Sequence, residues 1–171
     1  MNMLTRCRLL LVLGCCWSVN VYAGLLSDDE NKAPPIEESA LALPAPPKSG
    51  DLLRYTVGAG ASMTFAIDAK SVSVGDDQIV RYSSVITSPS GVLNISYEGI
   101  RCKTAERKLF ATGRPDGSWN ALPDAEWRRI SGAGANSYQT TLFREFFCDG
   151  DAVAGKAATI VDRIRRNKPL R

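Results

Sequence analysis

The chain has 171 residues, 21 basic and 18 acidic side chains, and no histidine. The nearly balanced charge predicts no bulk attraction to nucleic acid. The lack of histidine excludes Ser-His-Asp and Cys-His catalysis and histidine metal sites, and although a Ser-Lys dyad stays open, no local pattern identifies one. We therefore expect no catalytic residue, no metal site and no cofactor, in a protein that is not an enzyme.

Residues 1–23 have the pattern of a secretion signal. Arg6 and Arg8 form the positive region, an apolar stretch covers residues 9–21, and Val21-Tyr22-Ala23 predicts cleavage before Gly24. A retained membrane anchor would need about 20 apolar residues, more than this interrupted stretch supplies. Cleavage would remove two of the 21 basic residues, leaving 19 against 18 acidic ones and a net charge of +1.

Cys15 indicates a second processing route. The run Val12-Leu13-Gly14-Cys15 resembles a lipoprotein box, in which the cysteine becomes the lipidated N-terminus. The apolar run before Cys15 is short and Leu13 is unusual at its position, so we treat lipidation as the alternative to cleavage at Gly24. Either route exports the chain to the periplasm or the envelope. The lipidated form would be an outer-membrane lipoprotein, joined to a membrane only through this anchor.

Cys102 and Cys148 remain once the signal is removed. Two cysteines in an exported chain most often pair, and closing a loop of about 46 residues contributes about 4 kcal/mol in the chain-entropy treatment. The alternatives are a redox pair and a metal site. No CxxC spacing supports a redox pair, and two cysteines without a histidine supply too few metal ligands. We predict a structural disulfide.

Residues 24–50 have the composition of a linker, because they hold more than half of the nine prolines, mixed with acidic and small residues. Such a stretch predicts a stiff, extended tether. The folded domain is expected over residues 51–148. Residues 149–171 are basic and predict either a docked helix or a frayed tail.

The first part of this domain predicts an antiparallel β-meander. Runs rich in β-branched and aromatic residues are separated by short turns, and strands joined in this way usually pair with their neighbours. In the central strand, Leu93, Ile95 and Tyr97 alternate with polar residues. Near Gly99 we expect either a β-bulge or a strand whose two faces are both partly buried. The expected strands span residues 52–57, 63–67, 71–74, 79–87, 93–102 and 107–112.

The second part predicts a helix with an aromatic face. Ser137 is the candidate N-cap and Asp149-Gly150 the stop. The apolar positions recur at steps of four and five residues: Tyr138, Leu142, Phe143, Phe146 and Phe147. The expected fold class is α+β, an antiparallel β-meander packed by a C-terminal aromatic helix, with one disulfide pinning the helix to the central strand.

Several short motifs occur in a fixed order between residues 67 and 148. They are Ile67-Asp68, Ser71–Gly75, Val80–Tyr82, Ser88–Gly91, Tyr97–Cys102, Glu106–Lys108, Gly113–Trp119, Trp127 and Leu142–Cys148. Together they resemble the cryptic neisserial protein family, a group of exported bacterial proteins, over about residues 50–148. The resemblance implies export and carries no activity. The layout is also similar to that of surface-adhesin E domains, but a function taken from that likeness would be analogy.

Two groups of carboxylates are candidates for a catalytic or calcium-binding site. Glu98 with Glu106 or Asp116 would supply the two carboxylates of a glycosidase. The strand alternation places Glu98 on the polar face, so we interpret these as exposed hairpin charges. Asp76-Asp77 lacks the ligand spacing of a calcium loop and predicts a plain turn.

Arg114, Trp119 and Trp127 form the candidate binding surface, because arginine beside aromatic residues is typical of such surfaces. The alternative is a solvated face with arginine packed on tryptophan. We expect a non-catalytic binding or structural module of the periplasm, whose partner is an unknown envelope protein or surface component and not nucleic acid. A surface-exposed adhesin-like module is the second hypothesis, and an enzyme the third.

Overall fold

The protein is described by a computed structural model that covers residues 38–132 and 137–170. The predicted signal, Cys15 and the first part of the expected linker lie outside these residues. Ile36–Arg171 form one unit. None of the helices in the described part of the chain is long and apolar enough to cross a membrane.

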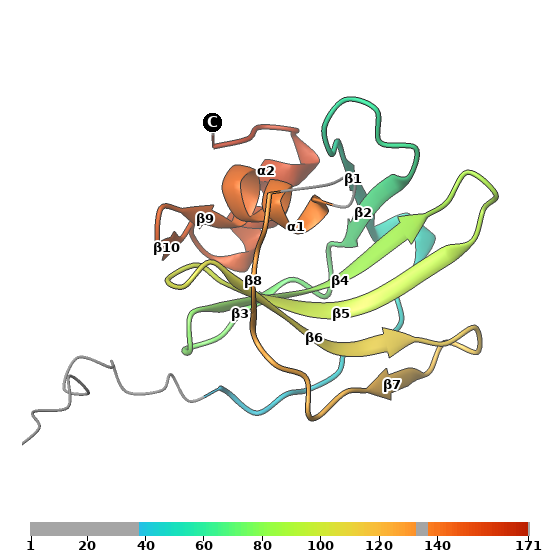
Figure 1. Cartoon of the computed structure of the whole chain (residues 1–171), viewed down its shortest axis with the longest axis horizontal. Coiled ribbons are helices and arrows are strands. Elements are labelled where there is room, and N and C mark those ends of the chain that lie inside the picture. Colours follow the sequence, from blue (N-terminus) through green and yellow to red (C-terminus); the bar gives the residue numbers. More distant parts are fainter. Residues whose placement is uncertain (1–37, 133–136, 171) are drawn as a thin grey trace, which may run out of the picture. The chain divides into compact units, whose positions relative to one another are not determined.

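Antiparallel strands form the main sheet in the order β1-β2-β4-β5-β6-β7 (Figure 1). Two short strands lie off this path, with β3 paired to β4 and β8 paired to β6. The predicted meander is therefore confirmed. The strands are β1 Leu52–Tyr55, β2 Thr64–Asp68, β3 Ser73–Val74, β4 Ile79–Thr87, β5 Leu93–Arg101, β6 Glu106–Gly113, β7 Trp119–Ala121 and β8 Arg128–Arg129.

The hairpin β4–β5 is the centre of the sheet. All nine residues of β4 pair in register with those of β5, from Ile79 opposite Arg101 to Thr87 opposite Leu93. The connecting turn closes with a hydrogen bond of 2.9 Å from the Gly91 N–H to the Ser88 carbonyl. Every residue from Ile79 to Val85 is buried, so both faces of β4 are covered along this stretch.

The aromatic helix lies where the sequence predicts it. It begins as α1, Tyr138–Thr141, and continues as a π-helix, Leu142–Phe147. The wider π turn accounts for the five-residue step between Leu142 and Phe147, both fully buried. Ser137 occupies the N-cap position, as predicted, although its side chain makes no capping hydrogen bond.

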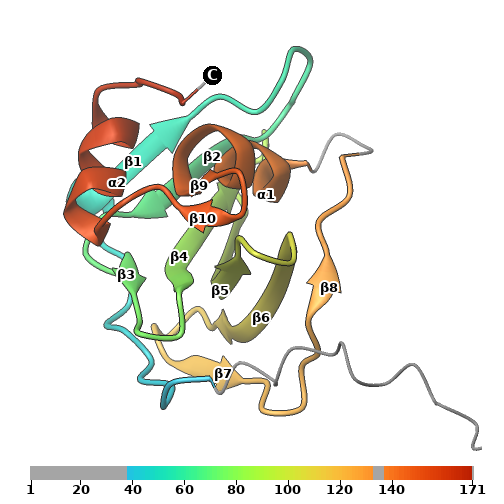
Figure 2. The same ribbon diagram turned by 90° about the vertical axis from the view of Figure 1, so that its left-hand side faces the viewer.

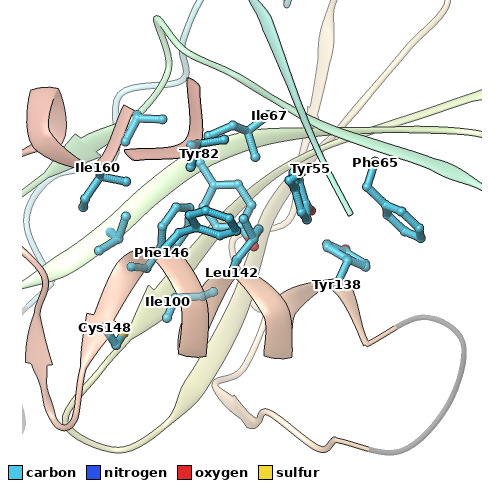
Figure 3. Packing of buried hydrophobic residues seen from close by; sticks show 14 of the residues in the cluster. Tyr55, Phe65, Ile67, Tyr82, Ile100, Tyr138, Leu142, Phe146, Cys148 and Ile160 are labelled. Carbon is cyan, nitrogen blue, oxygen red and sulfur yellow. The ribbon is translucent and has the colours of Figure 1, made fainter. Parts of the chain in front are cut away.

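The main core lies between this helix and one face of the sheet (Figure 3). Tyr82 of β4 packs edge-on against Phe147, with ring centroids 5.0 Å apart, and Phe65 of β2 stacks on Tyr138 at 5.8 Å. Large rings of this kind bury much apolar area and favour such offset contacts. The core therefore forms from two segments more than 50 residues apart, as the separation of Tyr82 and Phe147 shows.

The C-terminal residues form a docked helix and not a frayed tail. Two short strands, β9 Cys148–Asp149 and β10 Ala152–Val153, pair as a hairpin. The helix α2, Ala157–Arg165, follows them. Its Ile160 and Ile164 are buried in the main core. Arg163 donates through Nη1 to the Phe146 carbonyl at 3.0 Å, which joins α2 to the end of the π-helix.

The structure contains the predicted disulfide between Cys102 and Cys148, with Cα atoms 5.6 Å apart. Cys102 follows β5 and Cys148 follows the π-helix, and both are buried. The bond therefore fastens the helical layer to the central hairpin.

Replacing both cysteines with alanine is expected to lower the free energy of unfolding by about 2–5 kcal/mol, because the unfolded chain regains the freedom of the closed loop. Urea denaturation measures the change. Reductant should weaken the native protein and leave the variant unaffected, and equal sensitivity of the two proteins would contradict the prediction.

Candidate functional site

The sheet face opposite the helices carries a second aromatic cluster. Tyr82 points into the main core, so its neighbour Ser83 and the paired Tyr97 point the other way. Around Tyr97 lie Phe110 at 5.9 Å and Trp119 at 6.1 Å between ring centroids. Trp127 packs edge-on against Phe110 at 6.2 Å. We call these four rings, with Arg101 and Lys108, the tryptophan face.

A β-bulge positions Phe110 in this cluster. The β5–β6 register shifts between Tyr97 and Glu98, which leaves Phe110 without a partner on β5. Gly99 lies beneath the ring, because a Cβ atom at this position would be only 2.6 Å from Phe110 Cε2. The irregularity predicted near Gly99 is thus present at the preceding pair, and both faces of the strand are covered there as well.

Two cations border the tryptophan face. The Arg101 guanidinium lies 4.1 Å from the centre of the Trp127 ring. Lys108 Nζ lies 5.6 Å from the centre of Phe110 and 5.9 Å from that of Trp127. The negative faces of aromatic rings attract cations at these distances, so the rings hold positive charge at this surface.

Residues 38–47, which we call the N-terminal segment, lie on the tryptophan face. Figure 2 shows this segment, in blue, passing beside β7. Trp119 Nε1 donates to the Pro44 carbonyl at 2.7 Å, and Trp127 Nε1 donates to Glu38 Oε1 at 2.7 Å. Lys108 Nζ lies 3.1 Å from both Glu38 carboxylate oxygens. This part of the expected linker therefore differs from a free tether, because half-buried indole N–H groups need acceptors and the segment supplies them.

The contacts also act on the Glu38 carboxyl group. Partial burial raises its pKa, but the hydrogen bonds from Trp127 and Lys108 and the nearby positive charges outweigh burial and lower the pKa overall. The ionised form of Glu38 is thus the form that the tryptophan face stabilises.

A buried ion pair holds the start of the segment. Arg81 donates to Asp77 through Nη1 at 3.0 Å and Nη2 at 2.6 Å, and the Ser39 N–H donates to Asp77 Oδ2 at 2.8 Å. Burial raises the Asp77 pKa, but the bonds from Arg81, Ser39 and Ile79 outweigh it and hold the pKa well below its usual range. The turn at Asp76-Asp77 is confirmed, whereas the buried pair was not predicted.

The structure brings two of the three predicted surface residues together. Trp119 and Trp127 lie on the same face, whereas Arg114 is exposed in the β6–β7 turn and donates to Asn120 Oδ1 at 2.9 Å. That these three residues bind a ligand stays a prediction. Sequence reasoning missed Glu38, Ser39 and Pro44, although a proline-rich stretch in a chain with tryptophans in its loops is itself a signal of peptide packing on aromatic rings.

The expectation that Glu98 is an exposed hairpin charge is wrong, since its side chain points into the main core and the residue is 2% exposed. The helix covers the face that the alternation marked as polar. Its carboxylate accepts hydrogen bonds from four groups: Tyr138 Oη at 2.6 Å, Ser96 Oγ at 2.6 Å, Tyr82 Oη at 2.9 Å and Gln139 Nε2 at 3.3 Å. These donors come from β4, β5 and α1, so the carboxylate joins the helix to the sheet.

This arrangement is structural in character. Each oxygen of Glu98 already accepts two bonds, which fills the acceptor capacity of a carboxylate, although an open pocket of about 300 Å³ lies beside it. Burial and the charge of Glu98 raise the pKa values of Tyr82 and Tyr138, which keeps both hydroxyls as donors. Glu106 and Asp116 have partners of their own, Arg101 at 3.6 Å and Ser118 Oγ at 2.7 Å.

Among the described residues, no group of three or more acidic or cysteine side chains is placed to hold a metal ion. The site is therefore an aromatic and cationic surface of an antiparallel α+β domain. The chain belongs to the CNP1-like family, which it matches over residues 31–165. No curated protein and no solved structure matches it.

The family match corrects the expected extent of the resemblance, which was residues 50–148. It includes the N-terminal segment and the whole of α2. Both of these elements pack on the domain through the contacts described above, which gives a physical reason for the longer match.

Replacing Glu98 with alanine is expected to lower the free energy of unfolding by about 3 kcal/mol or more, because the buried Tyr82 and Tyr138 hydroxyls lose their acceptor. Urea denaturation measures the loss. The exposed Glu126 is the matched control, and its alanine variant should change stability by no more than about 0.5 kcal/mol. Equal effects of the two substitutions would contradict the assignment.

The Asp77 contribution to stability is expected to depend on pH in one direction. Because its folded pKa lies below the ordinary value of 3.8, the stabilisation is fully present above that value and is lost as pH falls toward the folded pKa. The stability difference between native protein and Asp77→Asn should therefore stay constant between pH 7 and pH 5 and shrink below about pH 4. A stability difference that is independent of pH would refute the prediction.

Proposed function

We propose that this domain is a non-catalytic polypeptide-binding module of the cell envelope, and that the tryptophan face is its binding surface. The observation that carries the proposal is the way this face holds an extended stretch of its own chain. Trp119 donates a hydrogen bond to a main-chain carbonyl, and Trp127 and Lys108 donate hydrogen bonds to a carboxylate. These are groups that an extended acidic polypeptide would present.

The composition of the face supports the same proposal. Tryptophan and arginine supply much of the energy of protein interfaces, and here Arg101 is stacked on Trp127. The cations border the rings without a large excess of positive charge on the whole chain, whose net charge is +3. Such a surface suits a local acidic segment better than a polyanion such as nucleic acid.

The proposed location is the periplasm or the envelope. The disulfide supports an oxidising compartment, and the signal pattern and the lipoprotein box around Cys15 support export. A surface-exposed adhesin-like module is the alternative. Protease treatment of intact cells would degrade the surface form and spare the periplasmic one, and a lipid label on Cys15 would identify the anchored form.

Partner recovery from envelope extract is expected to depend on Lys108. The bait is the processed chain with Glu38→Gln, so that its own carboxylate no longer competes for Lys108. Adding Lys108→Gln to this bait should lower recovery about tenfold because it removes a charge-assisted hydrogen bond. Adding Lys103→Gln instead, which changes an exposed lysine outside the face, is the matched control and should leave recovery unchanged. Equal recovery by both variants, with both folded by circular dichroism, would refute the proposed surface.

A further inference from the structure

We propose that the tryptophan face recognises extended segments that carry a carboxylate six residues before a proline, and that the N-terminal segment occupies this site in cis until a partner segment of the same chemistry displaces it. This inference rests on the proposed function and names both the partner class and the resting occupant of the site.

The spacing follows from the two tryptophans. Trp127 receives Glu38 and Trp119 receives Pro44, each through a hydrogen bond of 2.7 Å. The two anchor points therefore fix a carboxylate and a main-chain carbonyl six positions apart on one extended strand of polypeptide. Proline at the second position restricts the backbone and lowers the entropy that a bound segment loses.

The contacts are of a kind that a segment from another protein can reproduce. The bond to Trp119 uses a main-chain carbonyl, and the bond to Asp77 uses the main-chain N–H of Ser39. The only side chain of the N-terminal segment that forms a hydrogen bond among these contacts is Glu38. Recognition thus requires an extended backbone with one carboxylate and a proline six positions after it, rather than a long specific sequence.

The N-terminal segment lies on the surface in a way that allows exchange. Leu41 and Leu43 are 42% and 38% exposed, and Pro46 is exposed as well. These side chains therefore stay partly in water, and no residue of the segment is fully buried, so the hydrophobic contribution that holds the segment is smaller than that of a core element. A segment that is held mainly by a few hydrogen bonds opens at a lower free-energy cost than the core elements.

The covalent connection explains why the site is filled at rest. The segment runs directly through Lys48 into the short helix Ser49–Asp51 and then β1. A short connection of this kind gives a bound segment an effective concentration of about millimolar. A free partner segment must therefore compete with the cis segment, and loosening the cis segment should raise the apparent affinity for it.

The test uses the processed chain and a release variant, Glu38→Gln with Ser39→Pro. The first change removes the carboxylate that Lys108 and Trp127 bind, and the second removes the N–H that Asp77 accepts. Both changes lie outside the domain core, so folding should be kept. Ala42→Pro is the matched control, because it adds a proline at an exposed position that makes none of these contacts.

The probe is a fluorescein-labelled peptide with the sequence of residues 38–48, and binding is read by fluorescence anisotropy. The release variant should bind it about tenfold or more tightly than the native chain or the Ala42→Pro control, because the competing segment is gone. A peptide with glutamine in place of Glu38 should bind the release variant about tenfold more weakly. When Lys108→Gln is added to the release variant, the two peptides should bind with equal affinity.

Three outcomes would overturn the inference. The release variant, shown to be folded by circular dichroism, could gain no affinity over the native chain. Both peptides could bind equally well. The release variant or the native chain could instead form dimers on size-exclusion chromatography with light scattering, which would identify a second copy of the chain as the occupant. If envelope partners were still recovered in a Lys108-dependent manner, the proposed function would stand while this inference failed.

Discussion

Burial of β4 on both faces is the constraint on which the structure depends. A strand in an antiparallel sheet usually has one face in water, but here every residue from Ile79 to Val85 is buried. The helices cover one face, with Tyr82 packed on Phe147. The tryptophan face and the N-terminal segment lie on the other. A sheet of this size needs two covering layers, and the chain forms the second from aromatic side chains and an irregular segment.

The same double burial determines where the polar groups of the sheet find partners. Glu98 lies on the helix side and accepts bonds from Tyr82 and Tyr138. Asp77 and Arg81 pair with each other, and Asp77 also accepts the Ser39 N–H. A buried charge is costly unless it is fully hydrogen-bonded. Each of these groups therefore fastens one covering layer to the sheet, Glu98 the helix and Asp77 the N-terminal segment.

These two attachments differ in strength, and the difference bears on the proposed function. The helix is held by a large aromatic core and by the disulfide to Cys102, so the helix side is the stable part of the domain. The N-terminal segment is held by a few polar contacts while Leu41 and Leu43 remain exposed. An exchangeable layer over an aromatic and cationic surface is the arrangement expected of a module that binds polypeptide segments.

The sequence by itself determined the first six strands of the sheet, the position of the aromatic helix and the cysteine pair, because local alternation, turn residues and the compartment expected of an exported chain each leave a direct pattern. It also placed Trp119 and Trp127 at a common surface. It did not predict β7 and β8. The burial of Glu98 and the contacts of Glu38 and Pro44 were decided only by the tertiary structure. Alternation shows that a strand has two faces, but it does not show what covers each face. Tyr138, which covers Glu98, is 40 residues away from it in the sequence, and Glu38 is 89 residues away from Trp127. Contacts at such separations arise from the packing of the whole sheet, and no local pattern in the sequence records them.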